Sequence, residues 1–87
     1  PQDYKEALKL FTKAAEQGYD NGQFKLGTMY SSGQGTPQDY VLAYMWFNLA
    51  ASSGDTEAVD FRDTTAKLMT PQQISEAERM AREWKKK

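Results

Sequence analysis

The sequence contains neither cysteine nor histidine among its 87 residues. Without cysteine the chain has no disulfide framework and no thiolate metal site. Without histidine it lacks the side chain that most often serves as a general base or a zinc ligand near neutral pH. These two absences exclude much catalytic chemistry, and we expect no active site, no metal and no cofactor.

Long apolar runs and an excess of one charge are also missing. The most apolar stretch, residues 40–51, has eleven apolar residues in twelve, whereas a spanning helix needs about 18 or more. Eleven basic against twelve acidic residues give a net charge of −1, which does not suit a surface that follows nucleic-acid phosphates. We therefore expect no membrane insertion and no nucleic-acid partner.

The start of the chain carries no signal-peptide pattern. It reads Pro1-Gln2-Asp3-Tyr4, without an initiator methionine and without a basic segment followed by an apolar one. We expect the natural chain to continue upstream.

The sequence repeats itself at an offset of 36 residues. Residues 1–18 read PQDYKEALKLFTKAAEQG and residues 37–54 read PQDYVLAYMWFNLAASSG, with nine of eighteen positions identical. Chance would give about one identity in such a window. A weaker third start follows at Thr70-Pro71-Gln72-Gln73. A period of this length is typical of a solenoid of stacked helical units.

Apolar residues within each unit follow the period of a helix. Tyr4, Leu8 and Phe11 recur at steps of three and four, and Gly18 and Gly54 stand where a helix would end. The pattern predicts an all-α solenoid of antiparallel helix pairs, with five helices near residues 2–17, 21–32, 38–53, 56–69 and 71–84. The expected N-caps are Asp20, Thr36, Asp55 and Thr70, with Gln23 and Gln73 completing capping boxes and Pro37 and Pro71 at first helical positions.

The repeat resembles a known family. The chain contains Leu26-Gly27-x-x-Tyr30-x-x-Gly33-x-Gly35, followed by Ala43-x-x-Trp46-Phe47-x-x-Ala50-Ala51-x-x-Gly54. This pattern is similar to the Sel1-like repeat (SLR), a TPR-like unit related to the tetratricopeptide repeat. The resemblance implies a scaffold for protein–protein interaction.

The resemblance also divides the chain, which we treat as one repeat-array domain over residues 1–87. Residues 1–18 look like the second helix of a truncated repeat, 19–54 like one full repeat, and 55–87 like a degenerate repeat helix followed by a C-terminal capping helix. Two positions depart from the family pattern. Gly22 stands where alanine is usual and should loosen its helix by about 1 kcal/mol, and Thr36 stands where valine is usual.

Two chemical alternatives are weaker than a scaffold. A phosphate loop at Gly33-Gln34-Gly35 would need a preceding strand and a Gly-Lys-Ser/Thr ending, which the sequence lacks. Helical repeats that read single-stranded RNA need a cationic groove, and residues 37–70 carry two basic residues against five acidic ones. We therefore interpret the chain as a non-enzymatic scaffold for a protein or peptide partner. The alternative is a fragment of a bacterial cell-envelope or peptidoglycan-associated protein, or of a hydrolase with its activity elsewhere.

The resemblance points to a binding groove. In tetratricopeptide-type arrays the first helix of each repeat lines the concave side, which here means helices 21–32 and 56–69. Leu26, Gly27 and Tyr30 match the family's packing positions, so the opposite stripe should face a partner. With the equivalent positions one repeat later, the predicted groove consists of Asn21, Phe24, Lys25, Thr28, Ser31, Glu57, Asp60 and Thr64. It suits an extended peptide with one apolar anchor and a basic residue; the alternative is an ordinary solvated helix face.

Two helix faces are expected to need a cover. Helix 2–17 would present a face that an earlier helix normally covers, so we expect weak self-association through it. Helix 38–53 carries a second apolar stripe. Val41, Leu42, Met45 and Leu49 form this stripe, and Ile74, Ala77, Ala81 and Trp84 supply a matching one on helix 71–84.

Overall fold

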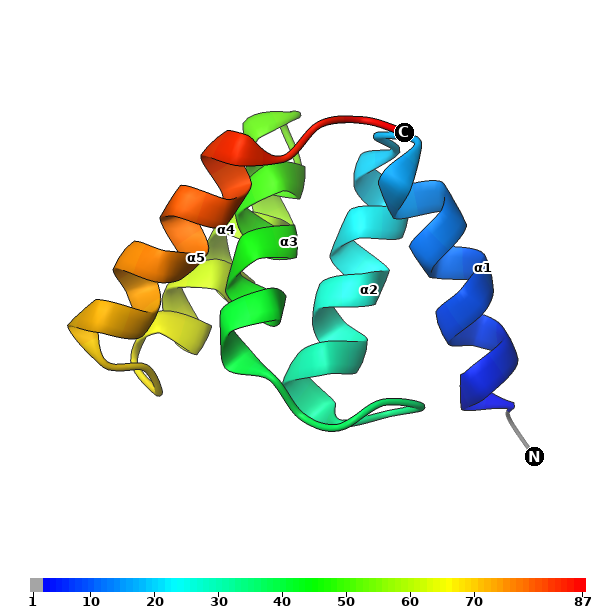
Figure 1. Ribbon diagram of the computed structural model, residues 1–87, viewed down its shortest axis with the longest axis horizontal. Coiled ribbons are helices and arrows are strands. Elements are labelled where there is room, and N and C mark those ends of the chain that lie inside the picture. Colours follow the sequence, from blue (N-terminus) through cyan, green and yellow to red (C-terminus); the bar gives the residue numbers. More distant parts are fainter. Residues whose placement is uncertain (1–2) are drawn as a thin grey trace.

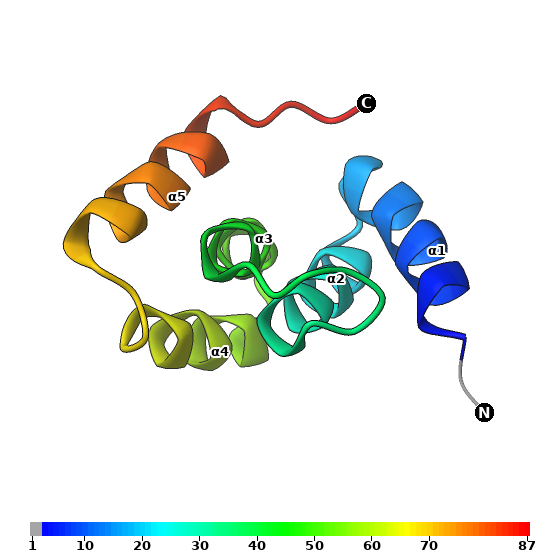
Figure 2. The ribbon, with the colours of Figure 1, turned by 60° about the horizontal axis from the view of Figure 1, so that its bottom comes forward.

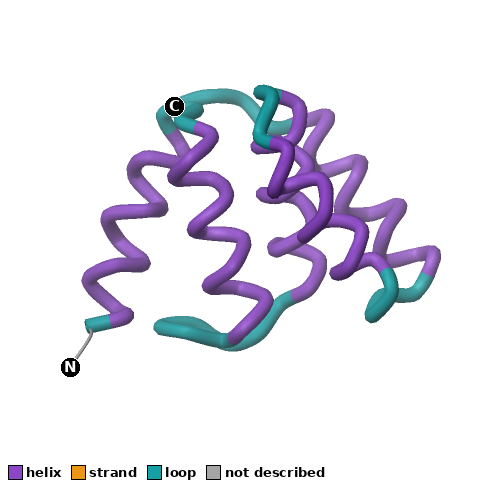
Figure 3. Tube along the Cα trace, turned by 180° about the vertical axis from the view of Figure 1, so that it is seen from behind, coloured by secondary structure: helices purple, strands orange, loops and turns teal. Residues whose placement is uncertain are grey.

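The computed structural model describes residues 3–87 as five α-helices joined by loops (Figures 1 and 3). The fold class is all-α, as the periodicity predicted. The expected start of the first helix at residue 2 lies outside the described residues. The helices are α1 (Tyr4–Glu16), α2 (Asp20–Ser32), α3 (Tyr40–Ser52), α4 (Thr56–Ala66) and α5 (Pro71–Glu83).

Consecutive helices run antiparallel, and α3 lies in the middle of them (Figures 1 and 2). It packs against α2, α4 and α5, while α1 packs on α2. The molecule measures 36 × 24 × 21 Å along its principal axes. The fifth helix makes its main contact with α3 rather than with α4, its neighbour in sequence.

Two of the predicted N-caps, Asp20 and Thr36, are wrong. The second helix begins at Asp20, with Tyr19 as N-cap. The Gln23 side chain is buried instead of completing a capping box, and its Nε2 donates to the Ala15 carbonyl over 3.3 Å. The third helix begins at Tyr40 because Asp39, not Thr36, caps it by accepting from the Leu42 N–H.

The remaining caps agree with the sequence. Asp55 accepts from the Ala58 N–H, and Thr70 forms the complete capping box with Gln73. The difference between the starts at residues 37 and 71 is the third residue of each motif. Pro-Gln-Asp supplies a short carboxylate that caps the helix itself, whereas Pro-Gln-Gln leaves the cap to the threonine before proline.

Helix ends also behave as the glycines predicted. Gly18 and Gly54 adopt φ angles of 91° and 103°, a left-handed conformation that other residues rarely adopt. The fourth helix ends at Ala66 rather than near residue 69. The N–H groups of Lys67 and Leu68 turn to the carbonyls three residues earlier, the tighter 3₁₀ pattern common at helix ends.

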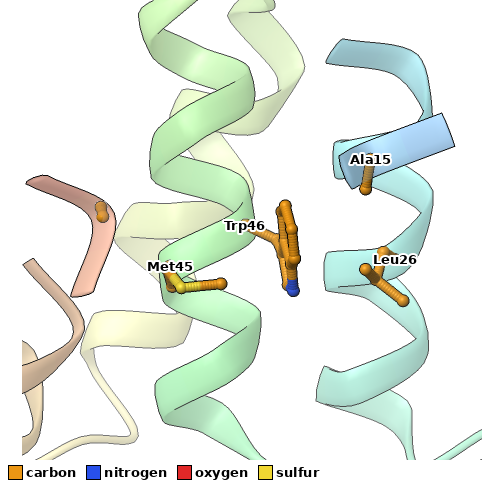
Figure 4. Close-up of a cluster of buried hydrophobic side chains, with 5 residues drawn as sticks. Ala15, Leu26, Met45 and Trp46 are labelled. Carbon is orange, nitrogen blue, oxygen red and sulfur yellow. The ribbon is translucent and has the colours of Figure 1, made fainter. Parts of the chain in front are cut away.

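The hydrophobic core lies where α1, α2, α3 and α5 meet. The Trp46 side chain extends from α3 toward Leu26 on α2, with Ala15 nearby (Figure 4). The fifth helix closes the other side of α3, where Ala81 joins the same cluster as Met45. The Trp84 ring packs edge to face on Trp46, with ring centroids 6.0 Å apart.

A polar contact also joins α3 and α5. The Tyr44 hydroxyl donates to Glu78 Oε2 over 3.3 Å. Burial raises the pKa of Tyr44, and the nearby Glu78 carboxylate raises it further.

The C-terminal tail crosses from α5 to the C-terminal end of α1 (Figure 1). The Lys87 N–H donates to the Glu16 carbonyl, and Lys87 Nζ pairs with Glu16 Oε2, both over 2.8 Å. A cation at the end of a helix interacts favourably with the helix dipole. The tail thus joins the last helix to the first.

Two glycines let helices approach more closely than any other residue would allow. A Cβ on Gly22 would lie 2.5 Å from the Ala14 Cβ of α1, and one on Gly27 would lie 2.6 Å from the Phe47 ring of α3. Gly22 therefore has a packing role that its low helix propensity does not reveal.

Replacing Gly22 by alanine should lower the free energy of unfolding by about 1–3 kcal/mol, the usual cost of overpacking a close contact. This loss should outweigh the gain of about 1 kcal/mol in helix propensity. Urea denaturation followed by circular dichroism measures the change. Asn21→Ala, at the exposed neighbour on the same helix, is the matched control and should not destabilise the protein. A Gly22→Ala variant more stable than the parent would contradict the packing role.

Candidate partner-binding surface

A hollow of about 360 Å³ opens between α2, the start of α3 and α4. We call it the α4 hollow. Its walls come from three helices and from the turn after α4, so its shape depends on how these helices pack. The lining residues are Ser31, Tyr40, Asp60, Phe61, Thr64, Thr65 and Leu68.

The apolar wall of the α4 hollow rests on an aromatic cluster. The Phe61 ring packs edge to face on Phe24 with centroids 5.0 Å apart, and lies 5.7 Å from the fully buried Phe47 ring. Phe61 is nonetheless 42% exposed, and Leu68 is 60% exposed. Phe61 is therefore held in place by the two rings beneath it, while its other side is open to solvent.

The polar side of the α4 hollow carries a carboxylate without a cation beside it. Among residues 3–87, Asp60 takes part in no ion pair. The nearest cation on its helix in sequence, Arg62, donates instead to Asp63 Oδ1 and to the side-chain Oδ1 of Asn48, both over 3.1 Å. The negative charge of Asp60 thus stays available to a ligand.

The structure divides the eight residues predicted for the groove. It brings Ser31, Asp60 and Thr64 together in the α4 hollow. Lys25 and Thr28 line a different hollow of about 280 Å³, beside α1. The other three lie elsewhere: Phe24 packs inside the aromatic cluster, and the exposed Asn21 and Glu57 line neither hollow.

Helix geometry explains this division. Residues on a helix follow one another at about 100°, so the stripe from Lys25 to Ser31 spans about 120° of the circumference. One edge of the stripe turns toward α1 and the other toward α4. A stripe of that width cannot line one groove when different helices lie on its two sides.

Tyr40, Phe61, Thr65 and Leu68 belong to the α4 hollow but were not predicted. One signal for two of them was present, because Phe61 and Leu68 are seven residues apart and so share a face of a continuing helix. Tyr40 comes from another helix, and only the folded structure brings it here.

Neither a metal site nor a membrane span is found in the described part of the chain. Residues 3–87 hold no group of three or more potential ligands that could bind a metal ion. No helix in this stretch is long and apolar enough to cross a bilayer.

The architecture defines a class of protein: an all-α solenoid of antiparallel helix pairs. The repeat within it is that of a known family. The Sel1 repeat matches residues 1–19 and 21–55, which together exceed half of the sequence. The chain belongs to the Sel1 repeat family, as the motifs indicated.

A solved structure supports the same assignment. It is a protective antigen present in uropathogenic Escherichia coli strains that displays an SLR fold, with a TM-score of 0.90 and 34% sequence identity. The match covers 94% of this chain and 18% of the antigen. Nearly all of this chain therefore has a fold already seen in a solved structure with an SLR fold.

Two curated fungal proteins are also similar. The chitin synthase regulator SKT5 of Saccharomyces cerevisiae is 32% identical over 59 residues, which is 68% of this chain and 8% of that protein. An uncharacterized Sel1-like repeat-containing protein of Schizosaccharomyces pombe is 44% identical over 46 residues, 53% of this chain and 7% of that protein. The chain thus spans less than a tenth of these relatives. The match to the Sel1 repeat favours a helical scaffold, and it does not favour the alternative of a fragment of a bacterial cell-envelope or peptidoglycan-associated protein or of a hydrolase.

Because the half-buried Phe24 packs on the Phe47 and Phe61 rings, Phe24→Ala should destabilise the fold by about 2–3 kcal/mol, less than the loss at a fully buried ring. Asp60→Asn, at an exposed side chain, should change the free energy of unfolding by about 0.5 kcal/mol or less. Urea denaturation of the two variants measures both values. Equal stability of the two variants would show that Phe24 is a surface residue after all.

Proposed function

We propose that this chain is a non-enzymatic helical-repeat scaffold that binds a segment of a partner protein on the face shared by α2 and α4. Sel1 repeats form helical scaffolds that typically mediate protein–protein interaction. The observation that carries the proposal is the α4 hollow, where exposed Phe61 and Leu68 lie beside the uncompensated carboxylate of Asp60. Apolar surface with a polar rim is typical of an interaction site.

The charges of this surface argue against a nucleic-acid partner, and the composition of the chain argues against catalysis. The exposed side chains of α4 include Glu57, Asp60 and Asp63, which repel nucleic-acid phosphates. The absence of histidine and cysteine removes the commonest bases and nucleophiles. A binding role requires only exposed apolar and charged side chains, which the chain has.

A partner identified with the full-length protein should lose affinity for the Asp60→Lys variant by about tenfold or more, because a charge reversal beside a contact repels the matching charge. Isothermal titration calorimetry with the purified partner measures the change. Glu83→Lys on α5 is the control, with the same charge change at an exposed site away from the α4 hollow. Affinity unaffected by Asp60→Lys would place the binding site on another face.

We also propose that α1 associates weakly with a second copy of the chain. Leu10 corresponds to Trp46 one repeat later. Trp46 is 7% exposed because it packs in the core against α2 and against Trp84, whereas Leu10 is 58% exposed. Leu10 lines a hollow of about 350 Å³ together with Leu8 and Thr12, and the charged side chains of Glu6, Lys9 and Lys13 border it.

Replacing Leu10 by lysine should abolish this association, because it removes the exposed apolar side chain and adds a third cation beside Lys9 and Lys13. Sedimentation equilibrium at increasing concentration measures the dissociation constant of the parent and the variant. We expect a value near the millimolar range for the parent. A parent protein that stays monomeric at millimolar concentration would contradict the proposal.

The opposite end of the array differs from α1, and we propose that α5 caps it. The outer side of α5 carries an exposed ion-pair network in which Arg79 binds both Glu76 and Glu83 over 2.7 Å. Hydrogen bonding to Arg79 lowers the pKa of Glu76. A charged outer face of this kind suits a terminal repeat unit, which needs a polar outer face for solubility.

A further inference from the structure

The α4 hollow has a direction, because its charged group and its apolar groups follow one another along α4 and the turn after it. Phe61 lies in the middle of α4 and Leu68 in the turn that follows Ala66, and both line the hollow. Thr64 lies between them in sequence and also lines the hollow. Asp60 precedes Phe61 and lies about 100° around the helix from it. The hollow therefore has an apolar wall with one carboxylate at its side.

Charges beyond the hollow strengthen this direction. Glu57 lies one turn before Asp60, so two exposed carboxylates mark the N-terminal half of α4. Lys67 follows the last turn of the helix and is exposed as well. A ligand with a cation at the Glu57 end matches this distribution, and a ligand with an anion there does not.

The size of the hollow limits what it can hold. About 360 Å³ is near the lower end of the range for small-ligand pockets. It accommodates one apolar side chain with part of its backbone. In an extended segment, side chains two residues apart point the same way and lie about 7 Å apart. A second side chain at that spacing reaches the rim where Asp60 lies.

We infer that the α4 hollow receives one leucine- or phenylalanine-sized side chain of an extended peptide segment, and that a lysine or arginine two residues away pairs with Asp60. The inference rests on the proposed function. It adds which side chain of the partner is bound, which charge lies beside that side chain, and where on this chain both bind. The wall of Phe61 and Leu68 excludes water from the anchor. Asp60 gains the cation that its own helix does not supply.

Three blocked hexapeptides test this inference. The first has the sequence Gly-Leu-Ser-Arg-Ser-Gly, the second replaces its leucine by serine, and the third replaces its arginine by glutamate. Each is titrated into the ¹⁵N-labelled chain and followed by amide chemical shifts. We expect the first peptide to shift the amides of residues 60–68, with a dissociation constant on the order of 1 mM. The other two should bind at least fivefold more weakly.

Two variants and two matched controls locate the site. Leu68→Ser and Asp60→Asn should each weaken the first peptide about five- to tenfold, and Asp60→Asn should also reduce the preference for arginine over glutamate. Leu10→Ser changes a leucine of nearly equal exposure, 58% against 60%, on the far helix α1, and should leave binding unchanged. Glu83→Gln should leave it unchanged as well. Circular dichroism checks that all four variants stay folded.

The possible failures are distinguishable. Equal binding of the three peptides, or shifts confined to another face, would overturn the inference. If the identified protein partner still loses affinity for Asp60→Lys, the proposed function stands without this anchor. If Leu68→Ser removes a self-association of the parent instead, the hollow is an interface between copies and the inference is wrong.

Discussion

The packing of the Phe47 ring on Gly27 sets the distance between α2 and α3. The ring is fully buried, and a single methyl at position 27 would lie 2.6 Å from it. Phe24 from α2 and Phe61 from α4 then pack on the same ring, with centroids 5.8 and 5.7 Å away. One glycine and one ring thus hold three helices together. The α4 hollow depends on this contact, because Phe61 belongs both to the cluster and to the wall of the hollow.

The placement of α5 explains why α4 keeps apolar surface exposed. Small residues on α5, Ala77 and Ala81, are buried, and the Tyr44 hydroxyl bonds to Glu78 across the contact with α3. The fifth helix is therefore committed to α3. The far side of α4, with Leu68 at its end, is left to solvent. Thus α5 stabilises the fold by packing on α3, and one side of α4 stays exposed to solvent.

The sequence predicted where the helices lie along the chain better than it predicted which helices pack against one another. Five helices follow from the apolar period and from glycines such as Gly18 and Gly54, because both signals are local. The start of α3 was misplaced because Thr36 and Asp39 are both good caps, and the sequence alone does not rank them. The site was predicted in part. Ser31, Asp60 and Thr64 meet, but Phe24 faces inward because α4 lies beside it, and no helical period reveals which neighbour a stripe will face.

The contact between the tail and α1 has a consequence for the order of folding. The helices are joined by loops of three to seven residues, and each packs mainly on a near neighbour in the chain. Such topologies have low contact order and fold in microseconds to milliseconds. The contact between Lys87 and Glu16 spans 71 residues and gains little until both ends are in place, since closing a long loop costs entropy. The tail therefore docks after the helices have assembled. The Lys87 side chain is exposed, so the contact between the tail and α1 should be among the first to open. The tail can then detach and dock again while the helices stay folded.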